Sequence, residues 1–218
     1  MIIIGRILTK YKQCSKGYLV HKNIFIMKKL LAVVALALIT LTMSAQEDYK
    51  ITVKAGVGLS SLVGSDADTK LSVAYKVGIS YDLALSEKFL IIPGLELSAK
   101  GFKSDLVDGK VTMTYLQVPV FAAYKFSIDG DVKLAIKAGP YVSYGLFGSD
   151  IQWDGGEKTN IFDSDWGYKR FDAGVIAGAQ LECDEYVLGV EYSRGLSKLD
   201  SNFKQFNQAF GIVLGYRF

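Results

Sequence analysis

"FGIVLGYRF", residues Phe210–Phe218, closes the chain with an alternating pattern in which every second residue is large and apolar. A period of two predicts a β-strand whose side chains point alternately to two different faces. Chain ends are usually frayed and polar, so a last strand that finishes on an aromatic residue needs neighbouring strands to order it. We expect this strand to pair with the first strand of a closed sheet, with Phe210, Tyr216 and Phe218 on its apolar face.

The same period of two continues back to residue 46, and no segment in this part of the chain favours a helix of useful length. The 22 Gly, 13 Tyr and 12 Phe residues also favour β-structure with tight turns. Proline cannot donate to a strand ladder, so Pro93, Pro119 and Pro140 predict bulges or bends inside three strands. The predicted strands are Lys50–Ser60, Lys70–Leu83, Lys88–Lys103, Lys110–Phe126, Val132–Phe147, Phe171–Glu182, Tyr186–Leu196 and Asn207–Phe218.

The connections between these runs alternate in length. Tight links such as residues 86–88 and 183–185 alternate with longer ones, of which residues 148–170 are the longest. An up-and-down meander then places all the long loops on one rim, which is typical of transmembrane β-barrels. The fold class that we predict is all-β, an eight-stranded antiparallel up-and-down transmembrane β-barrel.

The direction of the apolar face separates a membrane barrel from a soluble, lipocalin-like carrier barrel, which keeps its apolar residues inside. Aromatic residues of the apolar face gather near strand ends, with Tyr81 and Phe89 at one rim and Tyr144 and Phe171 at the other. Aromatic rings with a polar tip favour the two bilayer interfaces, whereas a soluble cavity gives no reason for such sorting. The runs of 11 to 17 residues are also long enough to cross a bilayer. We therefore expect the apolar face to meet lipid.

The opposite face of the strands carries small or polar residues, with charges of both signs that can pair inside a narrow lumen. Eight strands leave an interior just wide enough for side chains to fill. The predicted lumen charges are Lys54, Lys76, Glu96, Lys100, Lys133, Lys137, Asp172, Glu182, Glu191 and Arg217.

The N-terminal part of the chain has the three-part pattern of a secretory signal peptide. A positively charged start, Met27-Lys28-Lys29, precedes the 12-residue apolar run Leu30–Leu41, and we expect cleavage after Ala45. The apolar run is shorter than the roughly 20 residues that a membrane helix needs. The predicted domains are residues 1–26, a start codon assigned too early or an extended leader, residues 27–45, the signal peptide, and residues 46–218, the barrel domain.

Charge and cysteine content exclude other classes of protein. The net charge of the full chain is +3, but seven of its 25 Lys and Arg residues precede residue 46 and all 22 acidic residues follow it. The predicted mature part is therefore acidic, which removes the indication of nucleic-acid binding that a basic chain would give. Cys183 is the one cysteine after the leader, so neither an internal disulfide nor a cysteine metal site is expected.

Several segments resemble the PorT-like family of outer-membrane β-barrels. The resemblance covers roughly residues 46–218 and implies an eight-stranded barrel in the outer membrane of a Gram-negative bacterium. The family's name-giving member is linked to a protein secretion system, and none of these structural motifs carries that role. The segments are Leu97–Lys103, Tyr115–Phe126 with its Tyr, Pro and later Tyr, Phe171–Glu182 with its opening Asp-x-Gly, Val190–Asp200 and the closing "LGYRF".

Catalytic chemistry has little support in the sequence. Most enzymes of this barrel size use a histidine beside a serine or aspartate, and the only histidine, His21, lies in the leader. No zinc, dinucleotide or phosphate-loop pattern occurs, and "DSDW" (residues 163–166) lacks the ligand set of an EF-hand. We predict a protein that is not an enzyme and that has no cofactor and no metal.

The expected role is structural or interactive, with the long outer loops as the binding surface for a protein partner or ligand. The alternatives are a small porin, an accessory subunit of a secretion system, or a soluble carrier. We expect a monomer surrounded by outer-membrane lipid, assembled by the barrel-assembly machinery through its aromatic C-terminal strand, and no nucleic-acid partner. The candidate loop residues are Trp153, Asp154, Asp163, Asp165 and Trp166.

Overall fold

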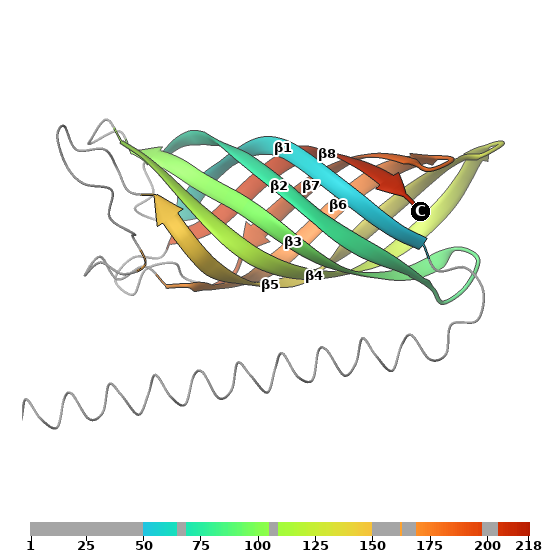
Figure 1. The fold of residues 1–218 in the computed structure, drawn as a ribbon, viewed down its shortest axis with the longest axis horizontal. Helices are drawn as coiled ribbons and strands as arrows, with labels where there is room; N and C mark the ends of the chain where they lie inside the picture. Colours follow the sequence, from blue (N-terminus) through green and yellow to red (C-terminus); the bar gives the residue numbers. More distant parts are fainter. Residues whose placement is uncertain (1–49, 65–68, 105–108, 150–161, 163–168, 198–204) are drawn as a thin grey trace, which may run out of the picture. The chain divides into compact units, whose positions relative to one another are not determined.

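A computed structural model describes residues 50–64, 69–104, 109–149, 162, 169–197 and 205–218. These residues form eight antiparallel strands that close into one barrel in chain order (Figure 1). The predicted fold class is confirmed, and no helix in the described part of the chain is long and apolar enough to cross a membrane. The strands are β1 (Lys50–Gly64), β2 (Thr69–Ala84), β3 (Phe89–Ser104), β4 (Gly109–Asp129), β5 (Val132–Ser149), β6 (Phe171–Cys183), β7 (Tyr186–Gly195) and β8 (Gln205–Arg217).

The last strand closes the barrel against the first one. Strands β1 and β8 are paired from Thr52 opposite Arg217 to Gly64 opposite Gln205. Beyond the end of β8, the Phe218 N–H donates to the Ile51 carbonyl at 2.8 Å, and the Ile51 N–H donates to the Phe218 carbonyl at 3.3 Å. The terminal aromatic residue is therefore held by β1, as the alternating pattern predicts, and the sheet has no open edge.

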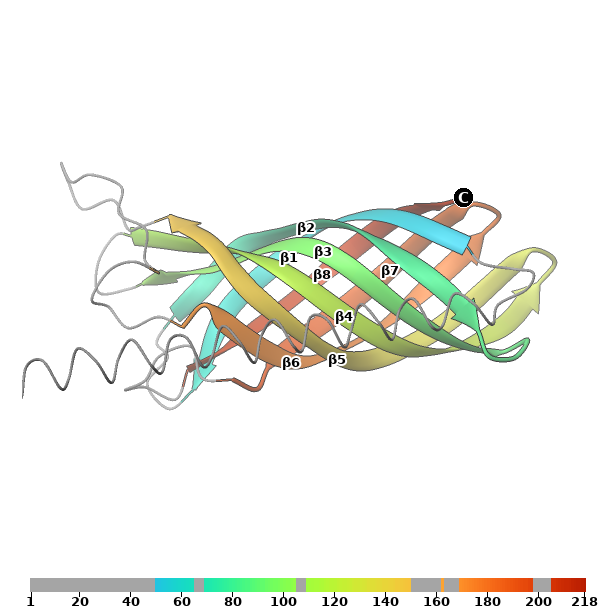
Figure 2. The same ribbon diagram turned by 60° about the horizontal axis from the view of Figure 1, so that its bottom comes forward.

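Tight turns join the strands at one end of the barrel, where the C-terminus also lies (Figures 1 and 2). In the β4–β5 turn Gly130 has a φ of 51°, and in the β6–β7 turn Asp184 has a φ of 50°. Glycine adopts this left-handed conformation without a steric cost, and aspartate is among the few other residues that tolerate it. These turns fix the short-turn end, and the other four connections leave from the opposite end. Two of them, residues 65–68 and 105–108, are no longer than the β2–β3 turn of residues 85–88, so the predicted alternation of short and long links holds only in part.

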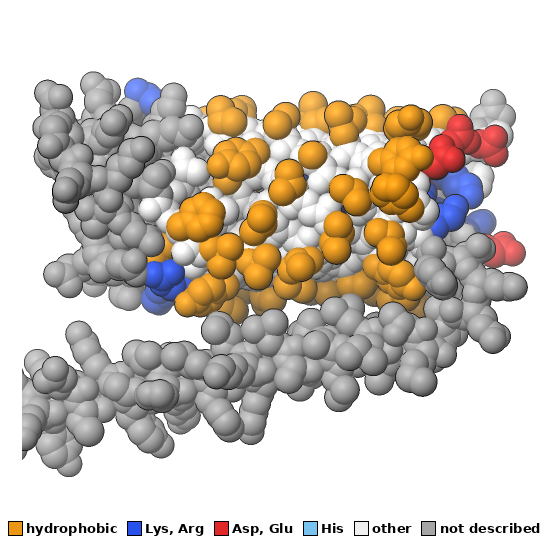
Figure 3. Space-filling view, in the orientation of Figure 1, with side chains coloured by type: hydrophobic (Ala, Val, Ile, Leu, Met, Phe, Trp, Pro, Cys, Tyr) orange, Lys and Arg blue, Asp and Glu red, His pale blue; other side chains and the backbone are white. Residues whose placement is uncertain are grey.

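Apolar side chains cover the outer wall of the barrel between its two ends, where the view in Figure 3 shows no charged side chain. At the short-turn end the outward aromatic rings touch one another. The Tyr216 ring lies 5.5 Å from that of Tyr186 and 4.9 Å from that of Phe218, and Phe89 lies 4.8 Å from Tyr124 (centroid distances). These contacts form the first of the two aromatic girdles that the sequence predicts.

A second girdle lies toward the long loops, where Tyr144 is paired with Phe171 and Tyr192 with Phe210. Eight residue steps separate Phe210 from Phe218. At about 3.3 Å per residue and a tilt of about 40°, the girdles stand about 20 Å apart, close to the height of the apolar band of a membrane barrel. Since the apolar face points outward, the soluble carrier alternative is wrong.

The interior corrects one prediction, because the inward faces are not only small and polar. Strands β3 to β6 also send large apolar side chains inward, and these side chains occupy much of the lumen. One cluster contains Leu90, Ile92, Phe121, Ala123, Tyr141 and Ile176, and another contains Leu62, Phe102, Val111, Met113 and Tyr115.

The three prolines do not mark bulges, since the register is unchanged across each of them, so this part of the prediction is wrong. Pro93 lies opposite Val120, and the β3–β4 ladder resumes at Glu96 opposite Gln117 in the same register. A missing proline N–H therefore leaves a gap in the ladder without inserting a residue. The register shifts lie between Leu71 and Tyr75, between Thr114 and Tyr115, and between Ser127 and Asp129.

Candidate functional site

The barrel interior gathers most of the predicted lumen charges. Lys133 differs, because it lies one residue inside the start of β5 and its side chain is exposed at the short-turn mouth. Asp82 and Lys125 are interior charges that the prediction missed, although both continue the inward alternation of β2 and β4 toward the strand ends. The predicted residues that the structure places inside are Lys54, Lys76, Glu96, Lys100, Lys137, Asp172, Glu182, Glu191 and Arg217.

A middle network of five charged side chains crosses the lumen. Lys54 Nζ lies 2.6 Å from Glu96 Oε1, and Lys137 Nζ lies 2.8 Å from Glu191 Oε1. Lys76 joins the two pairs, since its ammonium contacts Glu191 and lies 3.7 Å from Glu96. This middle network links β1, β2, β3, β5 and β7, so each of its charges has a partner of opposite sign on another strand.

Glycines on the neighbouring strands make room for these carboxylates. Glu96 is paired with Gly78, and Glu191 is paired with Gly178. A Cβ atom on Gly78 would lie 2.4 Å from the Leu95 carbonyl oxygen and 2.9 Å from the Glu96 Cγ. The interleaved glycines of the sequence thus have a packing function, which is to let long charged side chains lie flat across the inner wall.

A second charged layer lies toward the short-turn end. Glu182 accepts a hydrogen bond from Arg217 at 2.7 Å, and Lys125 Nζ lies 2.9 Å from the same carboxylate oxygen. Asp82 lies 3.4 Å from both Lys125 and Arg217. Two cations and two carboxylates therefore balance in this layer.

Asp172 is the centre of the third layer, toward the long loops, and its side chain has no exposed surface. Its carboxylate accepts hydrogen bonds from the Tyr141 hydroxyl at 3.1 Å, the Asn207 amide at 3.1 Å and the Ser197 hydroxyl at 2.7 Å. Ser197 lies two residues beyond the end of β7, and Asn207 lies near the start of β8. Asp172 therefore ties together the two ends of the β7–β8 connection.

Aromatic rings complete the surroundings of the buried lysines, a role that was not predicted from the sequence. The Lys100 ammonium lies 4.4 Å from the centroid of the Tyr141 ring, 3.9 Å from Asp172, and donates to Gln117 at 2.9 Å. The Phe121 ring lies between Lys54, at 5.4 Å, and Lys137, at 4.9 Å. Such cation–π contacts stabilise desolvated ammonium groups, and inward parity along β4 and β5 could have identified the rings.

Among the described residues, apolar packing extends toward the long-loop end of the barrel. Phe162 belongs to the longest connection, and its ring packs edge-on against Tyr115 at a centroid distance of 6.1 Å. The Arg170 guanidinium lies 5.3 Å from the Phe162 ring and donates to the carbonyl of Gly145 at 3.3 Å. The candidate loop residues Trp153, Asp154, Asp163, Asp165 and Trp166 lie outside the described residues.

The C-terminal strand presents its aromatic side chains to the outside, as predicted. Phe210, Tyr216 and Phe218 are exposed on the outer wall, whereas Val213 and Arg217 are buried in the lumen. The face that the sequence assigns to lipid is therefore the outer one.

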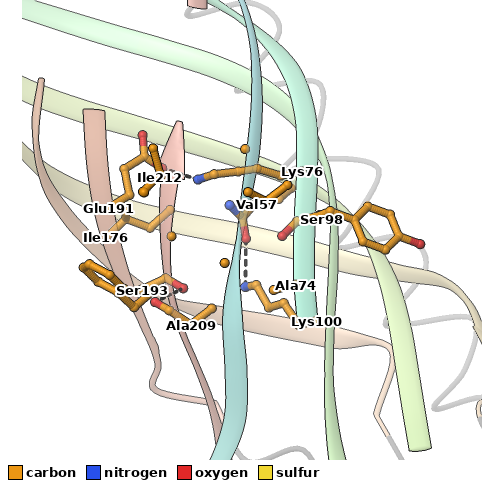
Figure 4. A pocket seen from close by; sticks show the side chains of 16 residues that line it. Val57, Ala74, Lys76, Ser98, Lys100, Ile176, Glu191, Ser193, Ala209 and Ile212 are labelled. Atoms are coloured by element: carbon orange, nitrogen blue, oxygen red, sulfur yellow. Dashed lines mark hydrogen bonds and ion pairs between the residues drawn. The ribbon is translucent and has the colours of Figure 1, made fainter. Parts of the chain in front are cut away.

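Cavities inside the barrel are small. One chamber of about 40 Å³ is lined by residues that include Lys76, Lys100 and Ser193 (Figure 4), and another of about 20 Å³ lies beside Lys54 and Asp82. The short-turn mouth holds a wider, open hollow of about 410 Å³. No group of three or more His, Cys, Asp or Glu side chains among the described residues has the geometry to hold a metal ion.

Comparison with solved structures finds other outer-membrane barrels. The chain is similar to Ail, the attachment invasion locus protein of Yersinia pestis, in complex with a heparin analogue (17% identity, 79% of this chain, 100% of that one, TM-score 0.43). It is also similar to the outer membrane enzyme PagL (15% identity, 76% of this chain, 98% of that one, TM-score 0.48). A third similar structure is that of Neisserial surface protein A (14% identity, 79% of this chain, 100% of that one, TM-score 0.48). Among curated proteins, none matches the sequence significantly.

A protein family also matches the chain directly. Residues 44–201 match the family described as Outer membrane protein beta-barrel domain. This match covers most of the closed barrel and agrees with its outward apolar face and its aromatic girdles. The chain therefore belongs to the outer membrane protein beta-barrel domain family and is a protein of the bacterial outer membrane.

Proposed function

We propose that this barrel is a structural and interaction protein, whose long outer loops contact a ligand or a protein partner. The filled interior is the observation that carries this proposal. Paired charges and aromatic rings occupy the lumen, and the two inner chambers lined by described residues measure about 40 and 20 Å³. A binding pocket for a small molecule typically needs about 300 Å³ or more, so the surfaces at the two mouths remain for recognition.

The way the longest connection is attached supports its use as a binding surface. Phe162 packs on the interior cluster beside Tyr115, and Arg170 donates to the carbonyl groups of Gly145 and Leu146 at 3.3 and 3.4 Å. A loop whose base is fixed loses less conformational entropy when it binds a partner. Its acidic and tryptophan residues, Asp154 and Trp153 among them, are the proposed contact groups.

We also propose that the protein is not an enzyme. The only histidine, His21, precedes the barrel, and the buried carboxylates contact cations or hydrogen-bond donors in the described interior. A carboxylate held in this way is not available as a general base near a substrate. Incubation of the purified barrel with outer-membrane lipids tests this proposal, and release of fatty acid above the level of a heat-denatured sample would contradict it.

Capture of partners from detergent-solubilised membranes tests the binding role. The intact protein is compared with a variant in which residues 150–161 and 163–168 are replaced by a Gly/Ser linker and Phe162 is kept. We expect specific partners to be lost with the loop sequence, while Glu87→Ser in a short turn retains them as a matched control. Equal capture by the loop variant would contradict the proposed surface.

Two finer assignments remain proposals. The PorT-like character rests on motifs such as Tyr115–Phe126 and Phe171–Glu182, and a role as an accessory of secretion would follow from it. Deletion of the gene with secretion intact would remove that role. A small porin is the other alternative, and the filled lumen argues against wide conduction.

A further inference from the structure

A chamber inside the barrel lies where small inward residues of β1, β2 and β8 face the long side chains of Lys76 on β2 and Lys100 on β3 (Figure 4). Gly56, Gly58 and Gly211 form part of its wall, and its volume is about 40 Å³. A water-sized particle needs about 10–15 Å³ on this measure, so the chamber has room for about three. Lys76, Lys100 and Ser193 line the chamber from three different strands.

The charged side chains that line this chamber are Lys76, Lys100 and Glu191, so its lining has one more cation than carboxylate. The middle network contains the three ammonium groups of Lys54, Lys76 and Lys137 but only the two carboxylates of Glu96 and Glu191. The other two layers each contain equal numbers of cations and carboxylates. The described interior therefore has one positive charge in excess, and an uncompensated buried charge is strongly unfavourable.

The protein's own groups compensate this charge only in part. The Phe121 ring faces Lys54 and Lys137 at 5.4 and 4.9 Å, which is a weak interaction compared with an ion pair. Lys100, which is almost fully buried, has its carboxylate partner Asp172 at 3.9 Å, beyond hydrogen-bond distance. Lys54 and Lys137 line the other chamber, so it is the weak ion pair of Lys100 that leaves attraction for a further negative charge in this one.

We propose that this chamber binds a small monovalent anion of the halide class, such as chloride. Lys76 and Lys100 supply the positive potential, and the hydroxyl groups of Ser98 and Ser193 line the same chamber, although that of Ser193 donates to the Ala209 carbonyl at 3.4 Å and would have to turn toward the anion. One bound monovalent anion makes the interior neutral, and the chamber still has room for a water molecule. Sulfate and phosphate are too large for this volume, and as divalent ions they would reverse the imbalance.

Crystals of the detergent-purified protein grown in sodium bromide test the site directly. We expect an anomalous difference peak in the chamber between Lys76 and Lys100. In detergent, the midpoint of thermal unfolding should be higher in chloride or bromide than in gluconate at equal ionic strength. The expected shift is about 3 to 6 °C at an anion concentration ten times the Kd.

Two variants make the test specific. Lys100→Met removes one cation and should abolish both the peak and the halide dependence of the midpoint. Ser193→Asp places a carboxylate in the chamber without removing a cation, so it should also abolish the halide dependence, even if Lys100→Met does not fold. A wild-type protein with no bromide peak and the same midpoint in all three salts would overturn the proposal, and so would a halide dependence that persists in Ser193→Asp.

Discussion

Inside the barrel, strands β1, β2 and β8 present mostly small residues, whereas β3, β4 and β5 present large ones. On the first wall the inward positions include Gly56, Gly58, Ala74, Gly78, Gly211 and Gly215. On the second wall, Tyr115, Phe121 and Tyr141 are almost completely buried. The large side chains of one wall therefore lie where the small residues of the other wall leave space.

This difference shows how an eight-stranded barrel becomes filled without a helix or a plug domain inside it. Since the interior is only as wide as two side-chain layers, a bulky residue on one wall needs a small residue on the other. The two walls should then respond differently to substitution. Adding atoms should be damaging on the small-residue wall, and removing atoms should be damaging on the large-residue wall.

The largest effect is expected from added volume at the closing seam. Gly58 is paired with Gly211, and a Cβ atom on Gly58 would lie 2.1 Å from the carbonyl oxygen of Phe210. We expect Gly58→Leu to prevent closure of the barrel, seen as loss of the faster-migrating folded band in unheated gel samples. Ala55→Leu, which points outward on the same strand, is the control that should keep this band. A folded band of normal intensity for Gly58→Leu would show that the seam can widen.

Removal of volume from the opposite wall is the next test. Phe121 has no exposed surface and lies between two lysines. We expect Phe121→Ala to lower the free energy of unfolding by about 3 to 5 kcal/mol, the usual cost of such a cavity. Denaturant titration in detergent micelles measures it. Phe126→Ala, on the outward face of the same strand, should cost clearly less, and equal costs would contradict the filled interior.

A smaller effect is expected from one polar contact of the large-residue wall. Tyr141→Phe removes the hydroxyl that donates to Asp172 at 3.1 Å while keeping the ring beside Lys100. A hydrogen bond to a charged group contributes about 1.5 to 3 kcal/mol, and the same denaturant titration should show a loss in that range. Tyr144→Phe, whose ring points outward, serves as the control. An unchanged midpoint for Tyr141→Phe would mean that Ser197 and Asn207 satisfy Asp172 alone.

The smallest effect should come from Lys133, which lies at the short-turn mouth and outside both walls. We expect Lys133→Gln to change the free energy of unfolding by no more than the roughly 0.5 kcal/mol typical of exposed positions. A larger loss would place Lys133 in the interior network, as the alternation of β5 alone predicts.

The alternation of period two was sufficient to predict eight strands, their up-and-down order and the outward direction of residues such as Phe210 and Tyr216. The same parity also indicates most of the interior charges, because each strand places every second residue inside. It could not show which cation meets which carboxylate, because those distances depend on register between strands. The large inward residues Phe121 and Tyr141 were missed, because an apolar residue on each face hides the alternation that a membrane strand normally shows.

Single-channel recording in planar bilayers tests the central claim, a filled barrel that acts through its surface, most directly. With interior chambers of about 40 and 20 Å³ and a lumen crossed by ion pairs, we predict no steady conductance from the purified, folded wild-type protein. A stable, large conductance that scales with the amount of folded protein would contradict this account and would identify the protein as a pore.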